Sequence, residues 1–248
     1  MEKVMLVTGA SRGIGAATAR LAAARGYAVG VNYLRNRSAA DALVTEIARA
    51  GGRALALQAD VSDEGEVARL FDDLQRSLGP VAVLVNNAGI LERQMRLEDM
   101  TLERFERVLA ANLTGTFLCA REAVRRMSMR RGGAGGAIVN LSSMAARLGA
   151  PGEYVDYAAA KGAVDALTVG LAKEVARDGI RVNAVRPGLI YTEIHASGGE
   201  PGRVERLKDA VPLGRGGQPE EVARAILWLA SDEASYVTGS FVDVSGGR

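Results

Sequence analysis

The feature that most constrains this chain's fold is a regular alternation of short apolar runs with amphipathic stretches of helical length. The apolar runs, rich in Val, Ile, Leu and Ala, cover residues 4–8, 27–33, 53–60, 81–89, 137–143, 180–188 and 240–247. Between them lie stretches whose apolar residues recur at helical spacing, at residues 16–26, 39–52, 63–79, 157–176 and 220–233. Near-continuous apolar strands are typical of a parallel sheet covered on both faces, and strand–helix alternation produces right-handed crossovers. The sequence therefore predicts an α/β protein with a Rossmann-type, doubly wound parallel sheet of about seven strands.

Composition excludes several classes of protein. The chain has 248 residues, 48% of them hydrophobic, which suits one large domain. A formal charge of +2 gives no sign of a nucleic-acid or membrane surface. With one cysteine, Cys119, and one histidine, His195, the chain can form neither an intrachain disulfide nor a Cys/His metal cluster, so we expect no metal. No apolar window approaches the length of a membrane span, and we expect a cytoplasmic protein.

A glycine-rich turn follows the first apolar run. It reads Thr8-Gly9-Ala10-Ser11-Arg12-Gly13-Ile14-Gly15, and a helical stretch follows at once. Glycines let the backbone approach an anion closely, and the N-terminus of the helix directs its N–H groups and dipole towards it. The spacing is G-x-x-x-G-x-G rather than G-x-G-x-x-G. Its position directly after the first strand predicts a site for the phosphates of a nucleotide.

The end of the second predicted strand indicates which dinucleotide binds. A protein that selects NAD usually has an acidic residue about twenty positions after the glycine turn, where it holds the ribose 2′-hydroxyl. Here the sequence is Asn32-Tyr33-Leu34-Arg35-Asn36-Arg37, without an acid, and Arg12 lies in the glycine turn. Arginine is a better partner for a 2′-phosphate than for a hydroxyl. We therefore predict that NADP(H) is preferred over NAD(H).

A tyrosine and a lysine lie four residues apart, at Tyr157 and Lys161, in a stretch of helical spacing without proline. Residues i and i+4 share one face of a helix, so a phenol lies beside an ammonium group. A nearby cation favours the phenolate and lowers the phenol's pKa. The pair therefore predicts a tyrosine that exchanges protons near neutral pH.

Four motifs together show a family resemblance. The glycine turn, Asn86-Asn87-Ala88-Gly89, Tyr157-x-x-x-Lys161 and Pro187-Gly188 occur in the order and approximate spacing of the short-chain dehydrogenase/reductase family. The resemblance covers the whole chain and is closest in style to 3-oxoacyl-carrier-protein reductases and glucose-dehydrogenase-like members. It implies that residues 1–248 form a single dinucleotide-binding and catalytic domain. It also implies hydride transfer between a nicotinamide and a ketone or secondary alcohol.

The resemblance implies roles for single residues. Tyr157 is the general acid/base, Lys161 also bonds the nicotinamide ribose, and Asn112 helps hold a water in a proton relay. Asp60 and Val61 contact the adenine. The cofactor-binding residues expected from the glycine turn, the arginines and the resemblance together are Gly9, Ser11, Arg12, Gly13, Ile14, Gly15, Asn32, Arg35, Asp60, Val61, Asn86, Ala88, Gly89, Tyr157, Lys161, Pro187, Gly188 and Thr192.

The catalytic serine has two candidates, because the predicted fifth strand ends in Ser142-Ser143. Ser143 lies fourteen residues before Tyr157, where many relatives have thirteen, and Ser142 lies fifteen before it. We prefer Ser143, since one extra residue in the following loop absorbs the offset. Ser142 is then expected to have a supporting role.

The substrate and partners are less constrained. Residues 90–95, 147–155 and 190–199 are expected to line the substrate pocket, and residues 191–217 could form a movable lid. We expect a small carbonyl or alcohol substrate, no nucleic-acid or membrane partner, and a homotetramer. Arginines at 121, 125, 126, 130 and 131 could dock an acyl carrier protein, although a solvated charged face is the favoured interpretation. The alternative to an enzyme is a non-catalytic NADP(H)-binding sensor, against which the presence of Asn112, Ser143, Tyr157 and Lys161 argues.

Overall fold

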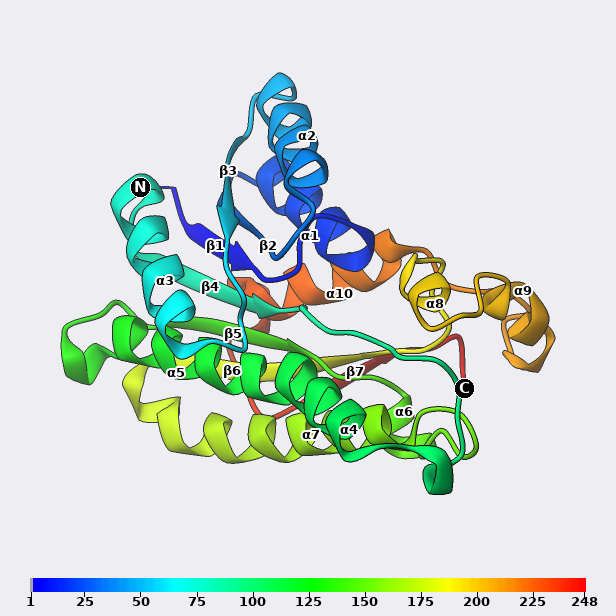
Figure 1. Ribbon diagram of the computed structural model, residues 1–248. Coiled ribbons are helices and arrows are strands. Elements are labelled where there is room, and N and C mark those ends of the chain that lie inside the picture. Colours follow the sequence, from blue (N-terminus) through cyan, green and yellow to red (C-terminus); the bar gives the residue numbers. More distant parts are fainter. Residues whose placement is uncertain (1) are drawn as a thin grey trace.

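A single sheet of seven parallel strands forms the middle of the molecule in the computed structural model, which describes residues 2–248. The strands lie in the order β3-β2-β1-β4-β5-β6-β7, as predicted for a doubly wound sheet (Figure 1). Their bounds are Val4–Val7 (β1), Ala28–Tyr33 (β2), Arg53–Gln58 (β3), Val81–Asn86 (β4), Gly136–Leu141 (β5), Ile180–Pro187 (β6) and Phe241–Val244 (β7).

Ten α-helices connect or cover these strands in the described residues. They are α1 (Gly13–Ala24), α2 (Arg37–Arg49), α3 (Glu64–Leu78), α4 (Leu102–Leu109), α5 (Gly115–Met127), α6 (Ala145–Leu148), α7 (Val155–Val175), α8 (Ile194–Ser197), α9 (Arg203–Leu207) and α10 (Pro219–Ala230). A π-helical turn over Ala110–Thr114 joins α4 to α5. Five short 3₁₀ turns complete the described helical structure, at Leu97–Asp99, Met129–Arg131, Ala176–Asp178, Lys208–Ala210 and Asp232–Ala234.

Each face of the sheet has its own hydrophobic core. On one face, α1, α2 and α10 pack on the strands, with Val31, Val85 and Val185 in the sheet facing Leu43 of α2 and Ile226 of α10. On the other face, α3, α5 and α7 cover the sheet around a second core that includes fully buried side chains of α3 and α5 (Figure 1). This arrangement explains why the strands lack polar alternation, because both of their faces are buried.

The strand order indicates which edge of the sheet can hold a binding site. β1 pairs with β2 on one side and with β4 on the other, so the chain reverses direction of winding at β1. In open α/β sheets a crevice forms at the carboxyl ends of the strands next to such a reversal. The turn after β1, the loop after β4 and the loop after β5 all open onto that edge.

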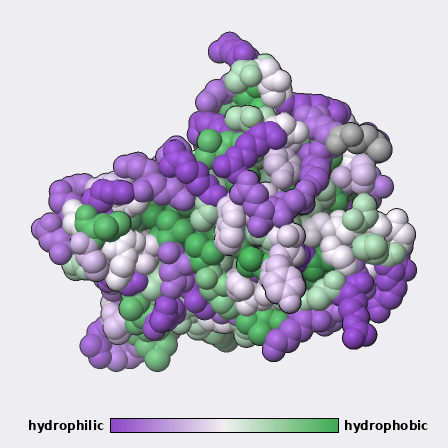
Figure 2. Space-filling model, turned by 180° about the vertical axis from the view of Figure 1, so that it is seen from behind, coloured by the Kyte–Doolittle hydropathy of each residue, from purple (hydrophilic) through white to green (hydrophobic). Residues whose placement is uncertain are grey.

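The predicted lid region is partly helical. Residues 191–217 contain α8, α9 and a 3₁₀ turn rather than an irregular loop. In Figure 1 this segment projects beside the carboxyl ends of the strands, and from behind it forms a lobe with hydrophilic residues along its rim (Figure 2). Over residues 2–248, no helix combines the length and the apolar character needed to cross a membrane.

Candidate active site

A cavity of about 900 Å³ opens along the carboxyl edge of the sheet. Its lining combines the glycine turn, the ends of β2 and β3, the loops after β4, β5 and β6, and the start of α7. The three segments expected to line the substrate pocket all contribute, through residues such as Leu91, Tyr154 and His195. A crevice of this size at this edge can hold a dinucleotide together with a small substrate.

The glycine turn has the geometry of a phosphate-binding loop. Gly9 and Gly13 have φ angles of +60° and +56°, a conformation that glycine adopts without strain. The Asn32 carboxamide oxygen accepts a hydrogen bond from Gly9 N at 3.1 Å, and the Asn87 amide donates to the carbonyl oxygens of Thr8 (2.8 Å) and Gly9 (3.0 Å). The turn is therefore fixed from both sides, with the N-terminus of α1 directed into the cavity. Asn87 was missing from the predicted set, although its motif was recognised.

Two predicted cofactor residues lie outside the cavity lining and have supporting roles instead. A Cβ atom at Gly15 would lie 2.5 Å from the Asn87 amide and 2.8 Å from Gly9 O, so glycine is needed there for close packing under the turn. Asn86 is buried and donates to the Asn140 carboxamide oxygen at 2.9 Å. It joins β4 to β5 below the site.

The three arginines assigned to the 2′-phosphate are not equivalent. Arg12 and Arg35 line the cavity beside Asn32 and Asn36, and both are exposed. Arg37 lies outside the lining, in the first turn of α2, where its Nε is 3.4 Å from the carboxylate of Asp41. The predicted 2′-phosphate site therefore rests on Arg12 and Arg35, which line the cavity. No ion pair formed among residues 2–248 involves Arg12 or Arg35.

The remaining predicted cofactor residues line the cavity on both sides. Asp60 and Val61 follow β3, and the Asp60 carboxylate accepts hydrogen bonds from the Ser62 hydroxyl (2.6 Å) and backbone (2.9 Å). Ala88 and Gly89 follow β4. The others in the lining are Ser11, Ile14, Pro187, Gly188 and Thr192.

Tyr157 and Lys161 lie on α7 and face the cavity together. The Lys161 Nζ lies 5.5 Å from the centroid of the Tyr157 ring and donates a 2.7 Å hydrogen bond to Leu141 O at the end of β5. Burial raises the pKa of Tyr157 to about 12, and a hydrogen bond with the Ser143 hydroxyl opposes part of that rise. Burial lowers the pKa of Lys161 to about 8, against the opposing effect of the Asp165 carboxylate.

The predicted lowering of the tyrosine's pKa is therefore wrong for this structure. The helical spacing predicted a phenol beside an ammonium group, but Lys161 is only 3% exposed and Tyr157 is partly buried. Burial disfavours the charged form of each, which raises the pKa of a phenol and lowers that of an amine. The amine also donates to a backbone carbonyl.

The two serines after β5 have different surroundings. Ser142 is buried, and its hydroxyl lies 3.3 Å from Lys161 O, so it helps to dock α7 on β5. Ser143 is partly exposed in the cavity, where it reaches the Tyr157 hydroxyl, and its own oxygen accepts from Ala145 N at 3.1 Å.

Asn112 lies in the π-helical turn, fully buried. Its amide donates to Val108 O (2.9 Å) and Ile90 O (3.1 Å), and its carboxamide oxygen accepts from Ile90 N (3.3 Å). Single π-turns within helices are frequent at functional sites because they turn a side chain or a carbonyl out of the helical pattern. Here the turn lets Asn112 hold the loop after Gly89 against the cavity.

A buried ion pair supports the same loop and the start of α7. The Arg104 Nε donates to Asp156 at 2.7 Å, with side chains only 5% and 1% exposed. The same guanidinium donates to Arg93 O at 2.6 Å, and Asp156 accepts from Tyr157 N at 2.9 Å. The pair therefore ties α4, the loop after β4 and the first turn of α7 together, one residue from Tyr157. Sequence reasoning missed it because the partners are 52 positions apart.

Ion pairs from residues 191–217, the segment predicted to form a lid, lie at the end of the cavity where the substrate is expected. Arg203 of α9 pairs with Glu153, before α7, and with Glu200 at 3.0 Å. His195 of α8, expected in a surface or substrate loop, is 8% exposed and its Nε2 lies 3.0 Å from Ile190 O. These residues line the cavity, apart from Glu200.

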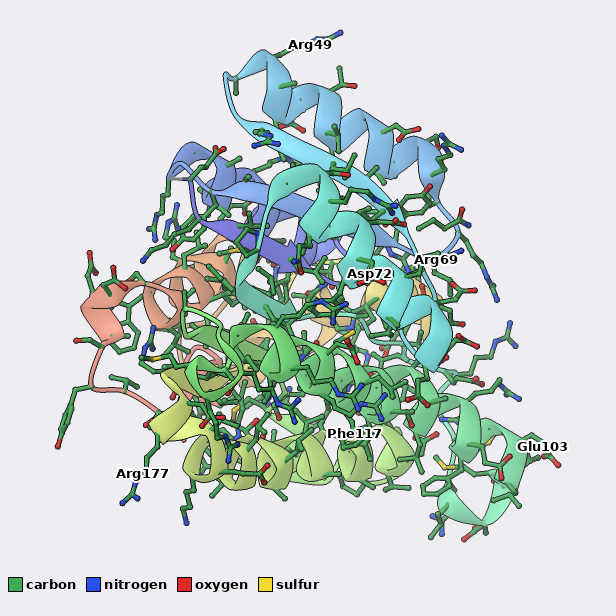
Figure 3. All side chains as sticks on the ribbon, turned by 90° about the vertical axis from the view of Figure 1, so that its left-hand side faces the viewer. Arg49, Arg69, Asp72, Glu103, Phe117 and Arg177 are labelled. Atoms are coloured by element: carbon green, nitrogen blue, oxygen red, sulfur yellow. The ribbon has the colours of Figure 1, made fainter. Side chains whose placement is uncertain are left out.

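Four of the five arginines in the cluster on α5 and the following turn pair with carboxylates. Arg121 pairs with Glu64, Arg125 with Glu122, Arg130 with Asp178, and Arg126 with both Glu122 and Asp72. Asp72 lies on α3 on the side that meets α5 (Figure 3). This agrees with a charged face balanced within the chain and gives no support to a docking surface for an acyl carrier protein.

Comparison with known proteins agrees with this fold and site. A family model described as enoyl-(acyl carrier protein) reductase matches residues 9–248. The oxidoreductase YgfF of Escherichia coli (strain K12), whose name describes it as uncharacterized, is 62% identical over 245 residues, which cover 99% of each chain. A 3-oxoacyl-[acyl-carrier-protein] reductase of Synechocystis sp. (strain ATCC 27184 / PCC 6803 / Kazusa) is 45% identical over 246 residues, covering 99% of this chain and 96% of that protein.

A solved structure is also similar over almost the whole chain. It is a dehydrogenase/reductase from Sinorhizobium meliloti 1021, with a TM-score of 0.91 and 35% identity, and the match covers 99% of this chain and 94% of that one. The fold, the site and these matches agree with the resemblance found in the sequence. The chain belongs to the short-chain dehydrogenase/reductase family of nicotinamide-dependent oxidoreductases, which act on CH–OH and C=O groups.

Proposed function

We propose that this protein is an NADP(H)-dependent reductase of ketones, with Tyr157 as the general acid. The observation that carries the proposal is the meeting of the Tyr157 hydroxyl and the Ser143 hydroxyl in one cavity with a glycine turn built for phosphates. The glycine turn, the absence of an acid at the end of β2 and the tyrosine–serine–lysine group all fit a nicotinamide dinucleotide. When bound, this cofactor supplies the hydride.

The residues of the chain supply the proton and the orientation. Because burial keeps the pKa of Tyr157 near 12, its hydroxyl is neutral at physiological pH and can donate to a ketone oxygen. Ser143 donates a second hydrogen bond to the same oxygen as negative charge develops there. A neutral phenol is the form that general acid catalysis of ketone reduction needs.

Lys161 and Asn112 act behind the tyrosine. The Lys161 amine is held by Leu141 O, where it can reach a ribose hydroxyl and stabilise the phenolate left after proton transfer. Asn112 fixes the Gly89–Ile90 segment and lies on the path by which a proton would return from solvent. The sensor alternative would leave this buried group of polar side chains without a use.

The preference for NADP(H) rests on Arg12 and Arg35. Both line the cavity where a 2′-phosphate would extend from the end of β2, and each could donate charge-assisted hydrogen bonds to it. We expect Arg35→Ala to weaken NADPH binding by about 10- to 100-fold, the range for hydrogen bonds to charged groups, and to leave NADH binding unchanged. Arg37→Ala is the matched control, because that side chain lies outside the cavity. Equal losses for both cofactors in Arg35→Ala would refute the assignment.

We also propose that residues 1–248 act as one dinucleotide-binding and catalytic domain. A homotetramer in the cytoplasm stays a prediction. Two large apolar side chains available for contact with other copies are Phe117 on α5, which is 46% exposed (Figure 3), and Trp228 on α10, which is 38% exposed. Sedimentation velocity of the purified protein measures the oligomeric state directly.

The deciding experiment is consumption of NADPH and NADH with a panel of carbonyl compounds, run with wild type and Tyr157→Phe. The panel contains β-ketoacyl thioesters, diketones and aryl ketones, with glucose and NADP tested in reverse. General acid catalysis contributes about 10²- to 10⁴-fold, so turnover should fall by that factor while NADPH still binds. Unchanged turnover in Tyr157→Phe would end the assignment. Tight NADPH binding without turnover of any compound would support the sensor alternative.

A further inference from the structure

Two residues at the substrate end of the cavity carry buried polar atoms without hydrogen-bond partners. Tyr154 is 3% exposed and His195 is 8% exposed, and both line the cavity. Within residues 2–248, the Tyr154 hydroxyl and the His195 Nδ1 are among the few buried side-chain atoms that make no hydrogen bond. Such atoms are costly, and in native proteins they often mark a site where a ligand completes the bonding.

The Tyr154 hydroxyl lies beneath the lid. A Cβ atom added to Gly198, the residue that follows α8, would lie 3.3 Å from the Tyr154 oxygen and 3.4 Å from Leu91 Cβ. His195 is one helical turn before Gly198, in α8 itself. Tyr154 and His195 therefore line the cavity from two segments that meet beside Gly198, namely the segment before α7 and the predicted lid.

The hydrogen bond on the other side of the His195 ring determines what Nδ1 can bind. Nε2 lies 3.0 Å from Ile190 O, and because a carbonyl oxygen only accepts, Nε2 carries the proton. Burial lowers the pKa of His195, which keeps the ring neutral at physiological pH. Nδ1 is then an acceptor that needs a donor, while the Tyr154 hydroxyl can donate or accept.

Other groups at this end of the cavity are polar or charged as well. The guanidinium of Arg203 lies 5.2 Å from the centroid of the Tyr154 ring and pairs with Glu153. Glu92, after β4, pairs with Arg107 of α4 at 3.0 Å. A purely hydrocarbon substrate tail would cover these groups without giving Nδ1 the donor that it lacks.

We propose that the substrate is a hydroxyketone, whose hydroxyl group lies apart from the reacting carbonyl, donates to His195 Nδ1 and contacts the Tyr154 hydroxyl under the closed lid. The inference rests on the proposed function and names the substrate class of the same site. Tyr154 and His195 are thus specificity-determining residues, distinct from Tyr157 and Ser143, which act on the carbonyl.

The test compares matched pairs of ketones that differ by one hydroxyl, such as 4-hydroxy-2-butanone with 2-butanone and 4-hydroxycyclohexanone with cyclohexanone. The readout is the ratio of kcat/KM within each pair, measured with NADPH. The ketone without the hydroxyl leaves polar atoms of the site unpaired, and the loss of one such hydrogen bond lowers kcat/KM by about 10- to 100-fold relative to the hydroxyketone. Wild type should show this preference, and His195→Phe and Tyr154→Phe should each reduce it several-fold or more.

The ratio separates specificity from folding, because a general loss of activity cancels within each pair. Tyr191→Phe is the matched control, since that hydroxyl binds Glu205 at 2.8 Å outside the cavity lining, and the preference should be unchanged. A wild type that reduces both members equally would overturn the proposal, and Tyr157-dependent turnover would leave the reductase assignment intact. The same ratio in wild type, His195→Phe and Tyr154→Phe would also overturn it.

The comparison remains decisive if turnover is too slow to measure. The midpoint of thermal unfolding of the NADP-saturated protein is then recorded with each hydroxyketone and with the matching ketone that lacks the hydroxyl. A larger rise with the hydroxylated compound that disappears in His195→Phe supports the proposal even if the reductase assignment fails. Equal rises with both compounds refute it.

Discussion

The buried Arg104–Asp156 pair offers the most direct test of how this fold supports its site. Asp156→Asn keeps the shape of the side chain but removes its charge, leaving the Arg104 guanidinium buried without a counter-ion. The pair is almost wholly buried, so solvent cannot replace the lost partner. Removing one partner of a buried ion pair typically destabilises a protein by about 3–5 kcal/mol.

The assay is urea unfolding of the cofactor-free protein at fixed protein concentration. With a urea m-value near the upper end of the usual range, about 3 kcal/mol/M, the midpoint should fall by roughly 1 M or more. The double variant Arg104→Met/Asp156→Leu should regain most of the loss, because replacing both charges by apolar side chains of similar size is often neutral. Glu98→Gln is the control, since its pair with Arg96 is exposed and its removal should leave the midpoint unchanged.

Two results would refute this reasoning. One is a midpoint for Asp156→Asn that equals that of wild type. The other is a double variant that is less stable than Asp156→Asn, which would mean that the specific geometry of the pair, rather than an uncompensated charge, carries the stability. In the first case, contacts other than this pair would have to fix the first turn of α7.

Two further predictions follow from burial and from packing. Burial lowers the pKa of Lys161 from 10.5 to about 8, so the unfolded chain binds this proton more tightly than the folded chain does. The free energy of unfolding, relative to that of Lys161→Met, should therefore rise as the pH increases from about 8 to 10.5, by on the order of 3 kcal/mol in total. Urea unfolding at several pH values measures the difference, and a constant difference would contradict the assigned burial. Gly89→Ala should weaken NADPH binding, because the added Cβ would lie 2.5 Å from the Asn112 carboxamide oxygen. Gly170 lies at an exposed position of α7, where an added Cβ would have no atom within 4 Å, so Gly170→Ala should raise the free energy of unfolding by about 0.5–1 kcal/mol. NADPH titration and urea midpoints of both variants check this contrast, which an equal effect of the two changes would contradict.

The fold could be predicted because its signals are local. Each strand is a short apolar run with no polar alternation, and the glycine turn follows the first of them directly. These features fix the sheet type and place the cavity at one edge without any knowledge of side-chain contacts. Asn36 and Asp63, whose side chains accept hydrogen bonds from the first turns of α2 and α3, show how the helix starts were also encoded locally.

The parts that could not be predicted depend on contacts between distant segments. Arg104 and Asp156 meet only because α4 packs on α7. Arg37 seemed equivalent to Arg35 in the sequence, but Arg35 lines the cavity whereas Arg37 lies in the first turn of α2, outside the lining. His195 lies in a Gly- and Ser-rich stretch, yet a four-residue helix buries it against the cavity.

The pKa of Tyr157 shows why motif and environment must be considered separately. A Tyr-x-x-x-Lys spacing indicates which two groups lie on one helix face, and both of these groups line the cavity. The spacing says nothing about how far the surrounding chain removes the two groups from water, and here that removal raises the pKa of Tyr157 and lowers the pKa of Lys161. A neutral phenol beside a lysine whose pKa is near 8 is suited to giving a proton to a ketone oxygen. The burial that overturned the expected pKa shift therefore keeps the proposed proton donor neutral at physiological pH.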